Sequence, residues 1–304
     1  MDIQASQAAL IYQNLRKEFQ AGITEARTVA DPLYQTVPST SDSNVYGWLG
    51  HIPGFKEMFK GQTRVHRNVE SQSYTVANRK FEDTIEIDLD TVDDNQLGSY
   101  AGLAKSFGAV GMSKKDEVVF ELMNNGFTTA LAYDGLSWFN DAHKVGLSTV
   151  DNDLGSISLT EANLEAAMVK LRGFTVQPDK LSKARPLEPL ADKLLLVVNP
   201  ALWATASKMV SLRTVSTGGE NFLYKAAEVL STSYVTSTTA WFLLNVGAPM
   251  KPVIFQNRKD LQFRMLTPDN SDGAFDRDVY IYGAKMRCAA LPSLPWLACG
   301  SRGA

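Results

Sequence analysis

Hydrophobic positions recur every three to four residues in the first part of the chain, which is the periodicity of an amphipathic helix. These positions are Ala8, Tyr12, Leu15 and Phe19. Gly22 follows the last of them, and we expect it to end this helix. Between residues 29 and 44 the sequence is rich in proline, serine, threonine and aspartate. This composition favours an extended arm over a packed element.

Two further helices are predicted downstream. The first is long and covers about residues 93 to 125, although Gly108 and Gly111 in its middle predict a bend or a break. The second begins at Ser158, whose hydroxyl can cap the helix while Glu161 reaches back, which is the spacing of a capping box. Its expected buried stripe consists of Leu164, Met168 and Leu171.

Strand patterns lie between and after these helices. Apolar and acidic residues alternate in 85–90, and we expect this strand to return from a protruding hairpin over about 58–90. The apolar run 194–198 predicts a buried strand, and Asn199 with Pro200 predicts the start of another helix. Later strand candidates are 253–255, 261–265 and 279–287. Because helices and strands do not alternate regularly, the predicted fold class is α+β.

The composition is that of an ordinary globular protein, with 44% hydrophobic and 21% charged residues among 304. A formal net charge of −3 and the lack of a basic tail argue against DNA binding through phosphate neutralisation. No apolar run predicts a membrane helix, and the first residues do not resemble a secretory signal. We therefore expect folding in a cytoplasm, where Cys288 and Cys299 would stay as thiols.

Residues that could carry chemistry are few. The three histidines, His51, His66 and His143, are far apart and lack metal-ligand spacing. His143 follows Asp141 and could form half of a hydrolase dyad, but a loop histidine satisfied by hydrogen bonds is the favoured interpretation. We assign no catalytic, cofactor-binding or metal-binding residue, and we expect neither a cofactor nor an enzymatic activity.

An acidic run follows the basic stretch that contains Arg64 and Arg67. The run lacks the glycine of a calcium-binding loop, and Val92 occupies a position that needs an oxygen ligand. A solvated strand face is the default interpretation, and a subunit contact with the basic stretch is the alternative. The acidic residues are Glu82, Asp83, Glu86, Asp88, Asp90, Asp93 and Asp94.

Several local motifs, in their order and spacing, resemble the major head subunits of Mu-like bacteriophages over roughly residues 35 to 300. The motifs are Val37-Pro38-Ser39-Thr40, Asn44, Tyr46-Gly47-Trp48-Leu49-Gly50, Pro53-Gly54, Tyr74, Ala77-Asn78-Arg79-Lys80-Phe81-Glu82, Tyr133-Asp134-Gly135, Trp138-Phe139, His143 and Leu196-Val197-Val198-Asn199-Pro200-Ala201-Leu202. No single motif is specific, and the resemblance rests on their combination.

The resemblance implies the Hong Kong 97-like capsid fold, which has an N-terminal arm, an extended β-hairpin, a peripheral domain with a long spine helix, and an axial domain. The implied division is an N-terminal helix and arm at 1–50 and the hairpin at 51–91. The peripheral domain would take 92–191 and 276–304, and the axial domain 192–275. The residues of the lysine–asparagine cross-link known in certain relatives have no match here, so none is assigned.

The implied function is that of a major capsid protein that forms the icosahedral head shell around double-stranded DNA in a tailed phage or prophage. The expected partners are copies of the chain itself, as pentamers and hexamers, and the shell would enclose DNA without sequence-specific binding. Because the N-terminal portion is short, we also expect a separate scaffolding protein, a maturation protease and a portal. The subunit would assemble in the host bacterial cytoplasm and end in the virion, without a membrane. The alternatives are an encapsulin-like compartment shell and a soluble hydrolase.

Overall fold

The structure is a computed structural model that describes residues 3–49, 71–88, 97–177, 183–187, 193–214, 219–265 and 279–304. Its helical elements are α1 (Ile3–Glu25), α3 (Leu97–Asn124), α4 (Glu161–Arg172), η1 (Pro200–Leu202), α5 (Trp203–Ser211) and η3 (Pro295–Leu297). Its strands are β1 (Tyr34–Pro38), β2 (Ser43–Leu49), β3 (Ser71–Ala77), β4 (Arg79–Asp88), β5 (His143–Val145), β6 (Ser148–Val150), β7 (Thr175–Val176), β8 (Arg185–Pro186), β9 (Leu194–Val198), β10 (Glu228–Ser231), β11 (Trp241–Asn245), β12 (Val253–Met265), β13 (Val279–Pro292) and β14 (Ala298–Ser301). This mixture confirms the predicted α+β class.

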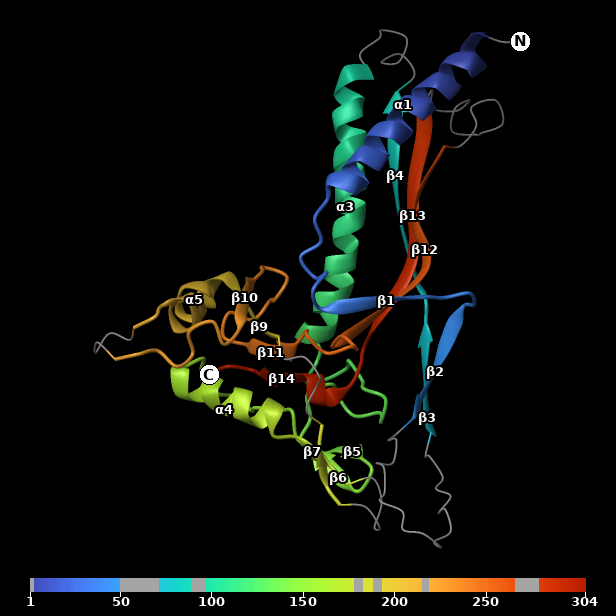
Figure 1. The fold of residues 1–304 in the computed structure, drawn as a ribbon. Coiled ribbons are helices and arrows are strands. Elements are labelled where there is room, and N and C mark those ends of the chain that lie inside the picture. The colour runs from blue at the N-terminus through green and yellow to red at the C-terminus, as the bar shows by residue number, and fades with distance from the viewer. Residues whose placement is uncertain are drawn as a thin grey trace, which may run out of the picture.

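A tall lobe is built on a four-stranded sheet with the order β1-β12-β13-β4 (Figure 1). β1 runs parallel to β12, and the other neighbours are antiparallel. Alternate residues of β13 are buried, because successive side chains of a strand point to opposite faces and one face of this sheet is covered. On that face Phe19 of α1 and Ala104 of α3 share a hydrophobic cluster with Phe263 and Tyr282. Both long helices therefore cover the same face of this sheet.

The glycines in α1 and α3 allow the two helices to cross at close range and do not interrupt them. A Cβ on Gly22 would lie 2.0 Å from the carbonyl oxygen of Lys105 on α3, and a Cβ on Gly108 would lie 2.3 Å from the carbonyl oxygen of Phe19 on α1. Gly111 faces the main sheet instead, since a Cβ there would lie 2.5 Å from the side chain of Leu261 on β12. The prediction that Gly22 ends the first helix is therefore wrong, since α1 continues to Glu25. The predicted break in the long helix is wrong as well, because α3 is one helix of 28 residues.

The segment predicted as an extended arm is extended but packed, which corrects the expectation for residues 29–44. Ala30 and Leu33 have no exposed surface and belong to the central hydrophobic core. β1 then pairs along its whole length with the start of β12. A buried carboxylate on α3, that of Asp116, accepts hydrogen bonds from the backbone N–H groups of Val29 (3.1 Å) and Ala30 (2.8 Å).

The strand predicted at 85–90 exists as β4, but its partner differs from the predicted one. β4 pairs antiparallel with β13 in the main sheet, and the hairpin is formed instead by β2 and β3. Ile87 is buried, whereas Glu82 and Glu86 are exposed, as the alternation of residue types predicts. The acidic residues from Asp90 to Asp94 and the basic stretch at Arg64 and Arg67 lie outside the described residues.

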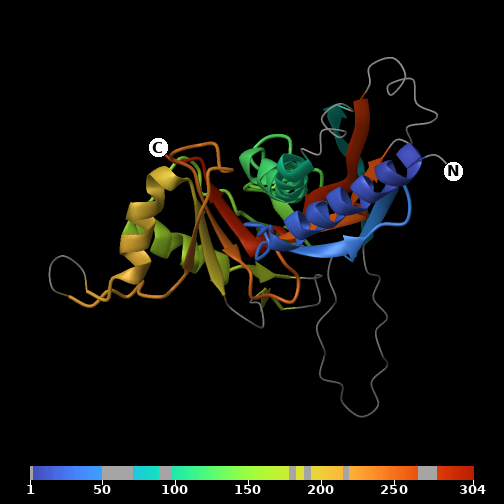
Figure 2. The same ribbon diagram turned by 90° about the horizontal axis from the view of Figure 1, so that it is seen from above.

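A second lobe lies beside the lower end of α3 (Figures 1 and 2). Its sheet has the order β10-β9-β11-β14, and all five residues of β9 are buried, which confirms the strand predicted at 194–198. The helical start predicted at Asn199 is confirmed, since its side chain accepts a hydrogen bond from the backbone N–H of Ala201. The cap predicted at Ser158 is wrong, because Thr160 caps α4 by accepting from the backbone N–H of Asn163.

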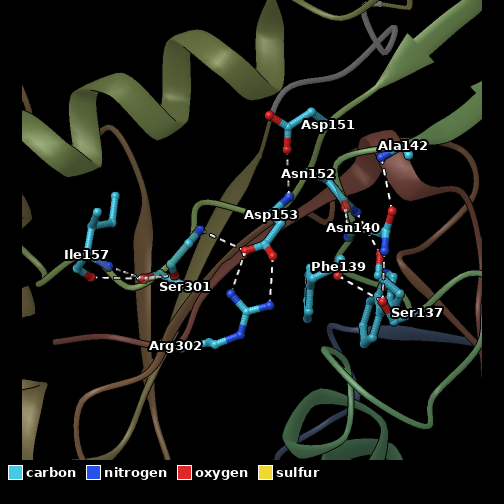
Figure 3. A network of polar contacts seen from close by, with 12 residues as sticks. Ser137, Phe139, Asn140, Ala142, Asp151, Asn152, Asp153, Ile157, Ser301 and Arg302 are labelled. Atoms are coloured by element: carbon cyan, nitrogen blue, oxygen red, sulfur yellow. Dashed lines mark hydrogen bonds and ion pairs between the residues drawn. The ribbon is translucent and has the colours of Figure 1, made fainter.

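A polar network ties the strand β14 to the segment that precedes α4 (Figure 3). Asp153 accepts a hydrogen bond from the guanidinium of Arg302 at 2.8 Å, and the hydroxyl of Ser301 donates to the carbonyl of Ile157 at 2.8 Å. The side-chain amide of Asn152 is fully buried and donates to the carbonyls of Trp138 and Pro295, both at 2.9 Å. The bonds from Ser301 and Arg302 join residues that are 144 and 149 positions apart in the chain.

Candidate interaction site

A two-stranded ribbon, formed by β2 and β3, extends from the tall lobe at the end away from α1 (Figure 1). The strands pair antiparallel from Ser43 opposite Ala77 to Leu49 opposite Ser71, without a register shift. Neither strand joins either four-stranded sheet. An isolated two-stranded ribbon is at best marginally stable in water, so this one needs support from outside itself.

The two faces of the ribbon have different surroundings. Tyr46 and Tyr74 lie opposite each other and are half-buried, whereas the neighbouring pair Val45 and Thr75 is exposed, with Val45 at 65%. Burial raises the pKa of both tyrosines, so both phenols stay protonated and can donate hydrogen bonds at neutral pH. The hydroxyl of Tyr46 donates to the side-chain carbonyl of Gln256 on β12 at 2.8 Å. The ribbon thus turns its aromatic face toward the main sheet.

A buried polar anchor fixes the base of the ribbon to β12. Gln256 has no exposed surface, and its amide donates to the side-chain carbonyl of Asn78 at 2.8 Å. Asn78 lies between β3 and β4, and its own amide donates at 3.0 Å to the hydroxyl of Ser39 and to the carbonyls of Ser41 and Asp42. The carbonyl oxygen and the nitrogen of both side-chain amides, of Gln256 and of Asn78, therefore all have hydrogen-bond partners, as buried polar groups require.

Two further contacts complete the anchor. The hydroxyl of Ser39 donates to the side-chain carbonyl of Asn44 at 2.8 Å, which links the end of β1 to the start of β2. The guanidinium of Arg287 on β13 lies 2.5 Å from the carboxylate of Asp42. Since Asp42 is largely exposed, this ion pair adds little stability, and the buried hydrogen bonds do most of the positioning.

The anchor unites several residues that the sequence singles out and one that it does not. Ser39, Asn44, Tyr46 and Asn78 all lie in the recognised motifs, and the structure brings their side chains together. Gln256 is missing from those motifs. Gln256 directly follows the apolar run 253–255, which is expected to form a buried strand. A polar side chain at the end of such a strand is expected to be buried and therefore hydrogen-bonded, and this is the feature by which the sequence could have identified it.

His143, the one histidine considered for catalysis, is part of the core. Its Nδ1 lies 2.8 Å from a carboxylate oxygen of Asp134, and its Nε2 lies 3.0 Å from the carbonyl oxygen of Trp138. Both ring nitrogens therefore have a partner within hydrogen-bond distance inside the core. Burial alone would raise the pKa of Asp134, but the hydrogen bond and charge of His143 lower it below its ordinary value. The partner is therefore Asp134, and the imagined dyad with Asp141 is not formed.

The remaining candidate groups have equally plain surroundings. Burial raises the pKa of Cys288 to about 11 and that of Cys299 to about 12, so both thiols stay protonated at neutral pH. Within the described ranges, no three histidine, cysteine or acidic side chains gather into a metal site. None of the helices described is long and apolar enough to cross a membrane. His51 and His66 lie outside the described residues.

Comparison with solved structures gives the class of the fold. A chain from the procapsid of bacteriophage JBD30 is similar with a TM-score of 0.59 and 22% sequence identity, over 97% of this chain and 75% of that chain. The fold is therefore that of a phage capsid subunit. The predicted capsid fold is confirmed by this match.

Sequence relatives point to one group of capsid proteins. The Mu-like prophage FluMu major head subunit of Haemophilus influenzae is 26% identical over 277 residues, which cover 91% of this chain and 67% of that protein. The major capsid protein of Escherichia phage Mu is 36% identical over 130 residues, which cover 43% of this chain and 42% of that protein. This chain thus matches about two thirds of the first relative's length and less than half of the second's.

Residues 8–158 and 235–304 match the family of the Mu-like prophage major head subunit gpT. The chain belongs to this family, and it is a capsid shell protein of the Mu-like type. The matched ranges contain the whole ribbon, its anchor and both sides of the network in Figure 3. The range without a match, 159–234, contains α4, β9, α5 and β10 of the second lobe.

Proposed function

We propose that copies of this chain form the closed icosahedral head shell of a tailed phage or prophage, as pentamers and hexamers around double-stranded DNA. The observation that carries this proposal is the β2–β3 ribbon, which extends from the body and is held to it mainly at its base (Figure 1). Such an arm buries little surface within its own subunit and offers much surface to a neighbour. Closed symmetric assembly then repeats each modest contact many times.

The anchor explains how a ribbon of this kind can serve as a contact arm. A contact between subunits needs a defined direction as well as surface, because a freely swinging arm loses conformational entropy when it binds. Tyr46, Gln256 and Asn78 set the direction of the ribbon through buried hydrogen bonds. The arm is therefore presented to a neighbouring subunit in one orientation.

The proposed partners of the shell follow from family resemblance and charge. A separate scaffolding protein, a maturation protease and a portal would act with the subunit during assembly in the host cytoplasm, and the virion would be its final location. A formal net charge of −3 supports a wall that encloses DNA without gripping its phosphates. Neither a cofactor nor an enzymatic role is proposed. The only candidate catalytic residue, His143, has both ring nitrogens engaged in the core.

We propose a domain division that follows the two sheets. The peripheral domain would contain the sheet β1-β12-β13-β4 with α1 and α3, and the axial domain would contain the sheet β10-β9-β11-β14 with α4 and α5. The ranges expected from the resemblance assign 192–275 to the axial domain and 92–191 with 276–304 to the peripheral one. Sheet pairing supports moving β12 to the first domain and α4 and β14 to the second.

The proposal is tested by electron microscopy of the purified chain after size-exclusion chromatography, beside a variant with a shortened ribbon. In this variant an Asn-Gly turn replaces residues 45–75 and joins Asn44 to Val76, which are paired in the ribbon. Asn44 and Asn78 stay in place, so the anchor to Ser39 is retained. We expect shells, tubes or rings of five or six subunits from the natural chain, and a folded subunit that forms none of them from the variant.

Two outcomes would contradict the proposal. One is normal particles from the shortened variant, which would remove the role of the ribbon. The other is a natural chain that stays monomeric even when it is produced together with a Mu-like phage scaffolding protein. An encapsulin-like compartment would differ by co-purifying with a protein cargo, and mass spectrometry of the particles distinguishes the two.

A further inference from the structure

The ribbon has two open backbone edges. The backbone N–H of Asn78 donates to the carbonyl of Asp42 at 2.9 Å, which makes this the first hydrogen-bonded pair of the ladder. Antiparallel pairs alternate, so Asn44 and Tyr46 turn their backbone groups toward β3, whereas Val45 and Gly47 turn theirs outward. Among the strands that the structure describes, none pairs with this outer edge of β2.

This edge lacks three features by which proteins often protect a free strand. Such edges normally carry charged side chains, proline or a bulge, which prevent pairing with another chain. The two seven-residue strands contain no lysine, arginine, aspartate, glutamate or proline, and their register is unbroken. The free edge of the main sheet provides a contrast. There β4 carries Arg79, Lys80, Glu82, Asp83, Glu86 and Asp88 in ten residues.

We infer that the outer edge of β2 pairs, antiparallel and about a two-fold axis, with the same edge of a second copy of this chain. This inference rests on the proposed function, in which many copies meet, and it names the contact that the ribbon makes. The two ribbons would become one four-stranded sheet, in which the backbone N–H and carbonyl groups of Val45 and Gly47 gain partners. Three or more strands are the usual minimum for a sheet that is stable by itself.

The choice of a second copy as the partner follows from symmetry and charge. A two-fold axis brings a strand against its own copy in antiparallel orientation, so a single surface is complementary to itself. Like charges that face each other across strands are destabilising, and β2 has none. β2 is the more open edge because β3 also lies against β13.

The pairing also accounts for Val45, an exposed apolar side chain of the ribbon. Val45 is 65% exposed on the outer face, where a lone valine gains nothing from burial within its own subunit. In the four-stranded sheet the side chains of Val45 from two copies would lie on the same face, close to the axis. Cross-strand pairs of β-branched residues stabilise sheets.

Cysteine cross-linking tests the pairing directly. The native cysteines have no exposed surface, so a cysteine introduced at Ser43, Val45 or Gly47 supplies an accessible thiol on β2. Gly47 accepts a side chain, because no atom lies within 4 Å of its Cβ position. Opposed residues in antiparallel strands are about 4.5–5.5 Å apart at Cα, which suits a disulfide. Val169→Cys, on α4 at 67% exposure, is the control.

The three variants are oxidised singly and as equimolar mixtures of two, so that the registers in which Ser43, Val45 and Gly47 oppose one another are all sampled. We expect one combination to give disulfide-linked dimers in large excess over the others and over Val169→Cys. Dimer yields that are equal at all positions, or no higher than for Val169→Cys, would overturn the inference. Electrophoresis without and with reductant gives the yields.

A charge substitution separates this inference from the proposed function. We expect Val45→Lys to weaken self-association by about tenfold or more in sedimentation velocity, because it places like charges across the axis. Val169→Lys makes the same change at a similar exposure and should sediment like the natural chain. If the natural chain assembles and Val45→Lys assembles equally well, ribbon pairing is wrong and the shell proposal stands. If the natural chain stays monomeric even when it is produced together with a Mu-like phage scaffolding protein, both are wrong.

Discussion

Gly108 in the middle of α3 lies directly beneath the backbone of Phe19 in α1, so that a Cβ on Gly108 would be 2.3 Å from the carbonyl oxygen of Phe19. No flexible side chain is involved in this contact, because the neighbouring atom belongs to helical backbone. The close approach lets Phe19 bury its ring almost completely, at 1% exposure, against Phe107 and Phe263. Two glycines, Gly22 and Gly108, thus determine how deeply α1 is seated on the lobe.

Gly108→Ala is therefore expected to destabilise the chain, by about 1–3 kcal/mol, since the added methyl group forces α1 away from α3. Gly102→Ala is the matched control, because it lies in the same helix and its Cβ position is open. Alanine there should raise stability by roughly 0.5–1 kcal/mol through helix propensity alone. Denaturant unfolding measures both changes. Equal and stabilising effects from the two substitutions would show that the helices are not in contact at Gly108.

A second prediction concerns Asn78 in the anchor of the ribbon. Asn78→Asp keeps the shape of the side chain but replaces an amide donor by a carboxylate oxygen, which would face the carbonyls of Ser41 and Asp42. We expect a loss of about 2–4 kcal/mol, since a charged group is left opposite acceptors. We also expect faster hydrogen exchange in β2 and β3, because the ribbon loses its fixed direction. Thr75→Ala, on the exposed face, should change neither measurement appreciably.

The buried pair His143 and Asp134 makes a prediction for mutation. His143→Ala leaves the buried carboxylate of Asp134 without its imidazole partner, and we expect a loss of roughly 3–5 kcal/mol in the free energy of unfolding. Asp141→Asn alters an exposed neighbour and should stay within about 0.5 kcal/mol of the natural chain. A large loss of stability from Asp141→Asn would indicate that His143 depends on Asp141, and would contradict its pairing with Asp134.

The same pair makes a prediction for pH. The pKa of Asp134 is lowered from 3.8 in the folded chain, so its contribution to stability is present above about pH 4 and is lost as the pH falls below that value. Asp134→Asn removes this group from the titration. The stability advantage of the natural chain over the variant should therefore shrink on acidification below pH 4, as followed by urea unfolding at several pH values.

Asp116 makes the opposite prediction, because burial raises its pKa above 3.8 even though the N–H groups of Ala30 and Val29 work against this. A raised folded pKa means that ionisation costs more in the folded than in the unfolded chain. The stability of the natural chain relative to Asp116→Asn should therefore fall as the pH rises from about 4 through the raised pKa. Glu117→Gln, an exposed carboxylate on the same helix, should show no such trend.

Sequence periodicity correctly predicts those elements that can be recognised from residues close together in the chain. The strand at 194–198, the helix with Leu164, Met168 and Leu171, and the cap at Asn199 all follow from neighbours in the chain. The misinterpreted features depend on distant residues. Gly22 and Gly108 look like helix breakers until the partner helix is known, and residues 29–44 look unpacked because their partners, Asp116 and β12, are far along the chain.

The candidate site shows the same limit. The motif residues Ser39, Asn44, Tyr46 and Asn78 can be selected from the sequence, but Gln256, which bonds directly to Tyr46 and Asn78, is at least 178 positions away from each of the four. The pairing of β4 with β13 is equally remote, and it decides that the hairpin comprises β2 and β3 instead of β4. The alternation of residue types predicts which side chains of a strand face the core, but it does not predict which other strand pairs with it.

The position of β13 sets the order in which the chain can fold. β13 lies between β12 and β4, and β14 forms an edge of the other sheet, so both sheets depend on residues 279–301. During synthesis, α1, α3 and the ribbon leave the ribosome long before the strands that complete their sheets. The sheet to which the ribbon is anchored is thus complete only after β13 has been made. We therefore expect a head subunit to become competent to join a shell only once these last strands are in place.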